Sequence, residues 1–396
     1  MGVYEALGVK PIINATGTFT RLGGSLMPPE VVEAMAQASR QFVCLEELQY
    51  RAGQAIAAMV GSEAAYVVSG AYAGVVLSIA ACITRLDPAK MDRLPNTAGL
   101  RREIVMAKAQ RNSYDHAVEL PGGVIVEAGR PDGCTADELE AAITDQTAAI
   151  FFMPDWSGPV TLADAVRVGR RHDVPVVVDA SGRLDEPHRL RDYVATGPDL
   201  IAFSGGKHIR GPQASGFVAG RRDLVAAIAW QHLDMDFSPA VSVAPPELLP
   251  MDQMPFVPRQ GIGRGYKAGK EEIVGLVTAL RLFLERDWAA ERAVWEARLH
   301  TIVAGLADAP GVRAEYLPRG DFHTGLPFAR VAIDPAVVGM TGNDFILALK
   351  RGDPPIHPSE RELARHAILI NPFSLVDGDE ARIVQRIREI VLGSQT

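Results

Sequence analysis

Short apolar runs rich in β-formers alternate with helical patterns from about residue 30 to residue 235, and this alternation constrains the fold most. It predicts an α/β fold with a mainly parallel sheet covered by helices, because parallel strands need long, usually helical crossovers. The runs expected to be strands are 65–68, 103–107, 124–127, 148–153, 174–179, 200–203 and 215–219. A helix is expected over 136–143, where Thr135 and Glu138 have the spacing of a capping box.

The remainder of the chain predicts a long connection followed by a smaller α+β domain. Residues 237–265 are rich in Pro, Met and Gly without a clear period, which favours a connection crossing the surface. A long helix is expected from Lys270 toward Arg286. Strands near 312–316, 329–333 and 367–370 and a closing helix over 379–391 follow it.

Composition and charge argue against several classes of protein. Forty Lys and Arg against 48 Asp and Glu leave a net charge of −8, so nucleic acid is not an expected partner. Cys44, Cys82 and Cys134 lie far apart, which suits a reducing cytosol and disfavours a zinc site. The most apolar stretch, 70–83, is too short to cross a hydrocarbon core of ~30 Å. We therefore expect a cytoplasmic protein with no membrane partner and no metal site.

The segment 203–213, Phe-Ser-Gly-Gly-Lys-His-Ile-Arg-Gly-Pro-Gln, carries the most informative chemistry. Lys207 follows paired glycines that would let a flat ligand approach the backbone, so it is a candidate Schiff-base lysine; a solvated loop lysine is the alternative. Asp179 ends an apolar run 28 residues earlier, and carboxyl ends of parallel strands face the ligand crevice. Its carboxylate would pair with a pyridinium nitrogen, unless it is only a turn or helix cap.

A third feature is the segment 67–74, Val-Val-Ser-Gly-Ala-Tyr-Ala-Gly, in which a strand passes through small residues into a helix. The N–H groups at Gly70 and Ala71 would hold a phosphate at the helix start, although tight packing also explains such turns. Ser69 and Ser204 would add hydroxyl groups. A helix-start phosphate site, a strand-end acid and a lysine together predict pyridoxal 5′-phosphate (PLP) as the cofactor.

Further motifs extend over nearly the whole chain, and they lie at 13–18, 21–25, 45–49, 68–71, 111–116, 203–213 and 269–276. On these motifs the sequence resembles the selenocysteine-synthase-like branch of fold-type I PLP enzymes, particularly its D-glucosaminate-6-phosphate ammonia-lyase-like members. The resemblance implies the aspartate-aminotransferase-like fold and a homodimer or larger homo-oligomer with shared active sites. It also implies an N-terminal segment, 1–30, packed with the small domain, a PLP domain over 31–265, and a connecting helix with the small domain over 266–396.

At two positions in the predicted site, this sequence differs from the sequences that it resembles. Gln110 stands where similar sequences usually carry the His of His-Arg-Asn, so Gln110 is a candidate cofactor contact and Tyr114 or His116 are substitutes for stacking. Arg183 stands where close relatives often read Asp-Ala-Ala-Ala-Gln. Its guanidinium would hold a substrate carboxylate or phosphate, with a surface ion pair as the alternative.

Other candidate residues come from the loop 259–267 and from the opening motif. Arg264 is expected at the cofactor phosphate of its own or a neighbouring subunit, and Lys267 at the substrate; ordinary solvated charges are the alternative. Asn14, Thr16 and Arg21 would close over a substrate or serve as an N-terminal structural clamp.

With PLP as the cofactor, the resemblance implies a PLP-dependent lyase. It would remove the β-hydroxyl of a small 2-amino-3-hydroxy acid and release ammonia and a 2-keto acid, with Lys207 as general base. A D-amino acid or an amino-sugar acid, phosphorylated or not, would suit it. An aldolase, a racemase, a selenocysteine-synthase-like transferase and a non-catalytic PLP-fold binding protein remain alternatives. So does a serine acyl-enzyme, because 204–207 fits Ser-X-X-Lys and 323–325 resembles Lys-Thr-Gly.

Overall fold

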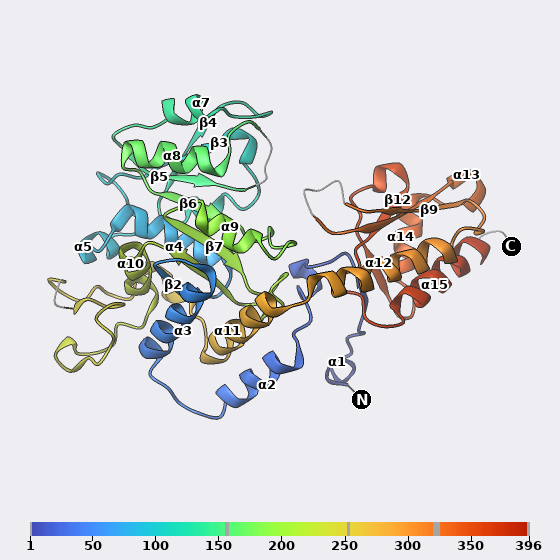
Figure 1. Ribbon diagram of the computed structural model, residues 1–396, viewed down its shortest axis with the longest axis horizontal. Coiled ribbons are helices and arrows are strands. Elements are labelled where there is room, and N and C mark those ends of the chain that lie inside the picture. Colours follow the sequence, from blue (N-terminus) through green and yellow to red (C-terminus); the bar gives the residue numbers. More distant parts are fainter. Residues whose placement is uncertain (1, 155–157, 252–253, 320–324, 394–396) are drawn as a thin grey trace. The chain divides into compact units, whose positions relative to one another are not determined.

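The structure is a computed structural model that describes residues 2–154, 158–251, 254–319 and 325–393 (Figure 1). It divides into a large unit, Met27–Glu285, and a small unit, Met1–Leu26 with Arg286–Thr396. The Lys-Thr-Gly-like segment 323–325 begins outside the described residues. Within the described ranges, no helix is long and apolar enough to cross a membrane, and no group of His, Cys, Asp and Glu is arranged to hold a metal ion.

The large unit is built on one seven-stranded sheet, and six of its strands point in the same direction. Its spatial order is β2 (Ala64–Val68), β8 (Gly216–Gly220), β7 (Leu200–Ser204), β6 (Val176–Asp179), β5 (Thr147–Phe152), β3 (Glu103–Ala107) and β4 (Val124–Ala128). Only β8 runs antiparallel to its neighbours, β2 and β7. The predicted strands and the mainly parallel sheet are confirmed, with strand bounds within two residues of expectation.

Helices cover both faces of this sheet (Figure 1). Strand residues such as Tyr66, Val177 and Ala202 share one core with α4 (Ala71–Thr84) and α10 (Arg222–His232). On the other face, Gly169 packs against Val176. The helices on that side are α3 (Leu45–Val60), α7 (Ala136–Ala141), α8 (Leu162–His172) and α9 (Arg189–Ala195).

Two helices show how local sequence produces these elements. The capping box predicted at Thr135 and Glu138 is present at the start of α7. Helix α4 is apolar around its whole circumference, and such a helix is stable only when it is buried on all sides. Its body is therefore buried in the unit, while its start at Gly70 lies partly open at the carboxyl edge of the sheet.

The remaining helices of the large unit lie outside these layers, and they are α2 (Pro29–Ala38), α5 (Pro88–Met91), α6 (His116–Glu119) and α11 (Lys270–Glu285). Helix α11 packs against α2 and α3, so it belongs to the large unit. The sequence-based boundary at residue 265 therefore differs from the boundary at residue 285 that this packing creates. The long connection before α11 is also less superficial than expected, because Leu248 and Leu249 are buried in the sheet core.

The small unit has a three-stranded antiparallel sheet in the order β12 (Ala367–Ile370), β10 (Phe328–Ile333) and β9 (Val312–Leu317). Its helices are α12 (Trp288–Gly305), α13 (Pro335–Val338), α14 (Gly342–Lys350) and α15 (Asp379–Gly393). The short helix α1 (Val3–Ala6) precedes β1 (Ile13–Ala15), which pairs in parallel with β11 (Ile356–Pro358). This pairing ties the N-terminal segment to the C-terminal sequence of the same unit.

Candidate active site

Strands β6 and β7 bring Asp179 and Lys207 to the same edge of the sheet. Asp179 is the last residue of β6 and pairs with Ala202 of β7, while Lys207 lies in the turn that follows β7. Burial lowers the pKa of Lys207 below that of an ordinary lysine. The negative charge of Asp179 opposes this shift, and the positive charge of Arg183 adds to it. A lysine held in this way loses its proton more readily than a solvated one.

The Nζ atom of Lys207 makes no hydrogen bond and no ion pair with any residue that the structure describes. A Cβ atom on Gly182 would lie 3.8 Å from Nζ, so the amine faces the turn that follows β6. Gly205 and Gly206 are needed for a reason other than ligand approach. Side chains there would collide with Ser215 and Gln213, because the loop folds closely back on β8.

Asp179 and Arg183 flank that turn. One carboxylate oxygen of Asp179 accepts a hydrogen bond from the N–H of Ser181 at 2.8 Å. The guanidinium of Arg183 has no acidic partner among the described residues, so the surface ion pair considered as its alternative is not formed. The guanidinium of Arg183 and the amine of Lys207, neither of them paired with a described residue, therefore lie close enough to interact electrostatically, and together they would stabilise an anion.

The start of α4 lies at the same edge, across β8. Gly216 pairs with Val68 of β2 on one side and with Ser204 of β7 on the other. The helix begins after Gly70, whose φ is +133°, and no side chain caps it. Its first N–H groups, beginning at Ala71, therefore point out of the helix without an intrahelical partner. Such a helix start attracts a phosphate group.

Two hydroxyl groups stand beside that helix start. Neither Ser69 nor Ser204 makes a side-chain hydrogen bond with any residue in the described part of the chain. Ser204 ends a strand and does not open a helix, so the Ser-X-X-Lys pattern lacks the helical setting considered for an acyl-enzyme.

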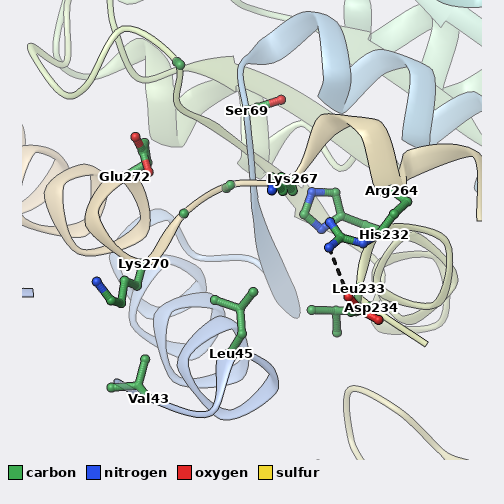
Figure 2. Close-up of a pocket in the computed structure, with 13 residues that line it drawn as sticks. Val43, Leu45, Ser69, His232, Leu233, Asp234, Arg264, Lys267, Lys270 and Glu272 are labelled. Atoms are coloured by element: carbon green, nitrogen blue, oxygen red, sulfur yellow. Dashed lines mark hydrogen bonds and ion pairs between the residues drawn. The ribbon is translucent and has the colours of Figure 1, made fainter. Parts of the chain in front are cut away.

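A cavity of about 560 Å³ adjoins Ser69 (Figure 2). Its wall also contains cationic side chains opposite apolar ones, and the lining residues used below are Leu45, His232, Asp234, Arg264, Lys267 and Lys270. Lys207 and Asp179 are not in this wall. The cavity thus borders the helix start and not the lysine itself.

The two cationic side chains predicted in the loop 259–267 differ in whether an acidic side chain binds them. Arg264 donates a hydrogen bond to Asp234 at 3.0 Å, which orients its guanidinium (Figure 2). Asp234 is further held by the N–H of Asp236 and the amide of Gln260, and these contacts lower its pKa. Lys267 is exposed and has no ion pair within the described residues.

His232 is a cavity residue that the sequence did not reveal. It is buried at the end of α10 and lies 2.9 Å from the hydroxyl of Tyr66 and 2.9 Å from the carbonyl of Tyr266. Burial lowers its pKa to about 4, with a further decrease from Arg264 and an opposing effect of the Tyr266 hydrogen bond. A single histidine at the end of a helix carries no motif, so no sequence signal identified it.

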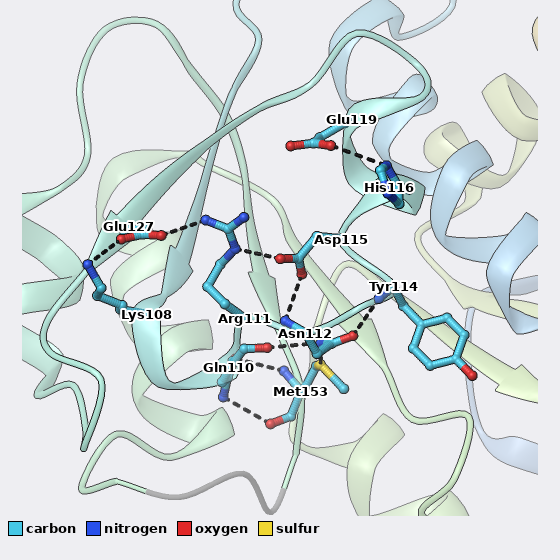
Figure 3. Close-up of polar contacts among 10 residues, drawn as sticks. All are labelled: Lys108, Gln110, Arg111, Asn112, Tyr114, Asp115, His116, Glu119, Glu127 and Met153. Carbon is cyan, nitrogen blue, oxygen red and sulfur yellow. Dashed lines mark hydrogen bonds and ion pairs between the residues drawn. The ribbon is translucent and has the colours of Figure 1, made fainter.

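Gln110 uses its amide within the protein (Figure 3). The side chain is fully buried; it donates to the carbonyl of Met153 and accepts from its N–H, both at 3.0 Å. These bonds tie the segment after β3 to the segment after β5. Both amide atoms of Gln110 are thus engaged by Met153, and the cofactor contact suggested by the sequence stays a prediction.

The Arg-Asn motif beside Gln110 forms a polar network at the surface (Figure 3). Arg111 binds Asp115 at 2.5 Å and Glu127 at 2.6 Å, and Lys108 binds Glu127 at 2.8 Å. The two suggested stacking residues, Tyr114 and His116, are exposed.

The opening motif serves the small unit. The carboxamide oxygen of Asn14 accepts from the N–H groups of Thr16 and Gly17, and its amide donates to the carbonyl of Gly17. The hydroxyl of Thr16 donates to the carbonyl of His357 at 2.7 Å. Arg21 pairs with Glu360 at 3.2 Å. In this structure, these contacts match the structural-clamp alternative.

Comparisons with known proteins agree with this arrangement. Residues 12–236 match the family model of SelA, described as L-seryl-tRNA selenium transferase. The chain belongs to the SelA family. Within it, the chain is 31% identical to the D-glucosaminate-6-phosphate ammonia lyase of Salmonella typhimurium, over 98% of this chain and 97% of the relative. It is 32% identical to the 5′-C-glycyluridine monooxygenase-decarboxylase of a Streptomyces species, over 98% and 92% respectively.

A solved structure extends this likeness to three dimensions. The structure of D-glucosaminate-6-phosphate ammonia-lyase matches all of both chains, with a TM-score of 0.84 and 29% identity. The SelA-family chain is thus a fold-type I enzyme with PLP as its cofactor. The site residues fit that group, because the start of α4 offers N–H donors without intrahelical partners, and the hydroxyls of Ser69 and Ser204 have no partner in the described ranges.

Proposed function

We propose that this enzyme is an ammonia lyase that converts a small 2-amino-3-hydroxy acid into a 2-keto acid and ammonia. The observation that carries the proposal is the partly buried amine of Lys207, which has no partner among the described residues and lies at the strand edge that also holds Asp179. Support comes from the ammonia lyase relative, which matches nearly the whole chain. The net reaction balances without an oxidant, since the hydroxyl-bearing carbon is reduced while the amine-bearing carbon becomes a ketone.

Three groups of residues would hold the cofactor. The start of α4 at Gly70 and Ala71, with the hydroxyls of Ser69 and Ser204, would bind the phosphate. Lys207 would bind the aldehyde, and Asp179 would hold the ring nitrogen protonated. When bound, PLP supplies an electron sink for the pair left behind when the substrate loses its α-proton.

Lys207 would then move the proton. Its lowered pKa leaves a larger fraction of the amine neutral at neutral pH, so Nζ can accept the α-proton of the substrate. Arg183 would bind the substrate carboxylate or a phosphate, because its guanidinium has no other partner among the described residues. Lys267 would add a further positive charge at the cavity. The β-hydroxyl would leave with a proton as water, and ammonia would leave after addition of water.

The surface near the cavity supports assembly into a homo-oligomer with shared sites. Phe42 is fully exposed and Val43 half exposed, although Val43 lines the cavity. Exposed apolar groups beside a site often mark an interface. We therefore propose that the enzyme acts in the cytoplasm as a homodimer or larger homo-oligomer. Light scattering of the purified protein measures the size of the assembly.

A second candidate reaction comes from the other relative. The chain is 32% identical to a monooxygenase-decarboxylase, so decarboxylation with consumption of oxygen would start from the same lysine and acid. Racemisation and aldol cleavage would also begin with these groups. Transfer to seryl-tRNA fits less well, because the net charge of −8 provides no general attraction for RNA.

A product screen separates these reactions. The purified enzyme is mixed with D- and L-2-amino-3-hydroxy acids and amino-sugar acids, with and without a terminal phosphate. We expect ammonia and a 2-keto acid in equal amounts without oxygen uptake. Oxygen uptake with carbon dioxide would favour the second candidate, and an aldehyde product would show aldol cleavage. Inversion of the substrate without ammonia would identify a racemase.

A further inference from the structure

His232 links the two sides of the cavity that faces the start of α4. Tyr66, its first partner, belongs to β2, which leads directly into Ser69 and the helix start. Tyr266, its second partner, ends the short helix η5 (Ile262–Tyr266), which contains Arg264 and leads into Lys267. One buried ring thus connects the strand before the phosphate-binding turn with the segment that carries the cations.

The partners determine which ring nitrogen carries the proton. A carbonyl oxygen can only accept, so Nε2 of His232 must donate to Tyr266. A neutral ring then has an unprotonated Nδ1, which accepts from the hydroxyl of Tyr66. The ring is neutral near pH 7 because its pKa lies at about 4. Both ring nitrogens of His232 are therefore engaged: Nδ1 accepts from the hydroxyl of Tyr66, and Nε2–H donates to the carbonyl of Tyr266.

The backbone around η5 has little freedom to take another position. A Cβ atom on Gly261 would lie 2.6 Å from the Cα of Gln231, and one on Gly263 would lie 2.8 Å from the carbonyl oxygen of Gln231. Beyond His232, Asp234 binds the guanidinium of Arg264 at 3.0 Å. The end of α10 therefore holds η5 by close packing, by the His232 hydrogen bond and by an ion pair.

We infer that His232 is a positioning residue: its Nε2–H bond to Tyr266 holds η5 so that Arg264 and Lys267 present their charges to a phosphate bound at the start of α4. The inference rests on the proposed function, since it takes that phosphate to be the cofactor's. His232 itself touches neither cofactor nor substrate in this role. It acts through the segment that Figure 2 shows between His232 and Ser69.

Two substitutions, His232→Gln and His232→Asn, distinguish this positioning role from a role in packing alone. Glutamine places its amide nitrogen at the same number of bonds from Cα as Nε2, whereas asparagine places it at the position of Nδ1. His232→Gln therefore retains a donor for Tyr266, and His232→Asn loses it. The full-length variants are titrated with PLP and, separately, with pyridoxal, which can bond to Lys207 but lacks the phosphate.

We expect His232→Asn to weaken PLP binding about tenfold, as for loss of one net hydrogen bond, and His232→Gln to weaken it less than about twofold. Pyridoxal affinity should stay equal in all three proteins. In a background lacking both cations, Arg264→Met with Lys267→Met, His232→Asn should have no further effect on PLP. Equal losses in Asn and Gln variants, or equal losses for PLP and pyridoxal, would overturn the inference.

A measurement on the unmodified protein guards against variants that fail to fold. Nitrogen-15 NMR of labelled histidines, assigned with His232→Gln, should show a neutral His232 ring protonated at Nε2. Protonation at Nδ1 would overturn the inference without any binding data. If the wild-type chain binds neither PLP nor pyridoxal at Lys207, the proposed function fails instead, and this NMR result still reports on the hydrogen bonds.

Discussion

The Cα atom of Gly216 faces the backbone nitrogen of Ala71 so closely that a Cβ atom on residue 216 would lie 2.9 Å from it. The same Cβ would lie 2.6 Å from the carbonyl oxygen of Phe203. Gly216 therefore lets the start of α4 lie directly over β8, between the strands that end at Val68 and Ser204.

Gly216→Ala should displace the start of α4. We expect a loss of about 1–3 kcal/mol in the free energy of unfolding from overpacking. PLP should bind about tenfold more weakly, because a displaced N–H group loses its bond to the phosphate. Urea unfolding and absorbance titration measure the two effects. Gly393→Ala is the control, since a Cβ there meets nothing within 4 Å; equal behaviour of both variants would contradict the account.

Lys207→Ala should abolish turnover while leaving the far-ultraviolet circular dichroism unchanged, because the substitution removes a partly buried amine that has no protein partner among the described residues. Borohydride reduction followed by peptide mass spectrometry should find the cofactor attached at residue 207 in the wild type only. Substantial residual turnover in the variant would exclude Lys207 as the catalytic base.

Arg183→Met should raise the pKa of Lys207, because the positive charge of Arg183 now lowers it. The pH dependence of acylation of Lys207 in the cofactor-free protein measures this pKa, and its midpoint should move to higher pH. Arg101→Met is the matched control, since Arg101 is exposed and has no side-chain partner in the described ranges. A midpoint that moves downward would refute the charge interaction.

Asp179→Asn should retain the turn, because the amide oxygen can still accept from Ser181. It removes the negative charge that raises the pKa of Lys207, so that pKa should fall. We expect kcat to decrease about 10²–10³-fold through loss of electrostatic support for the ring. Steady-state kinetics and the acylation assay measure both effects, with the exposed Asp145→Asn as control. Wild-type kinetics would remove Asp179 from the mechanism.

Gln110→Ala should leave the N–H and carbonyl of Met153 without their side-chain partner. An unsatisfied group costs about 1–3 kcal/mol when fully buried, and these two groups are partly buried, so the free energy of unfolding should fall by about 1 kcal/mol. Denaturant unfolding measures the loss, and Gln41→Ala is the exposed control. If stability is unchanged while PLP dissociates, Gln110 contacts the cofactor after all.

Much of the fold was predictable because it depends on local hydrophobic patterns, on capping residues and on the direction of the strands. The strand runs of the sheet and the capping box of α7 lie in contiguous sequence. Strand β1 and its partner β11 were not predicted, because each is only three residues long and they are distant in sequence. The place of α11 also depended on packing against α2 and α3, which no local pattern encodes.

The amino-acid sequence alone determined that Lys207 and Asp179 follow adjacent parallel strands, since strand polarity brings carboxyl ends to one edge. Tertiary structure decided which polar groups are free to bind a ligand. The amide of Gln110 is engaged by Met153, whereas the guanidinium of Arg183 has no such partner in the described residues. The reason is physical: a side chain's hydrogen-bonding capacity is consumed by neighbours that only the folded chain brings within reach.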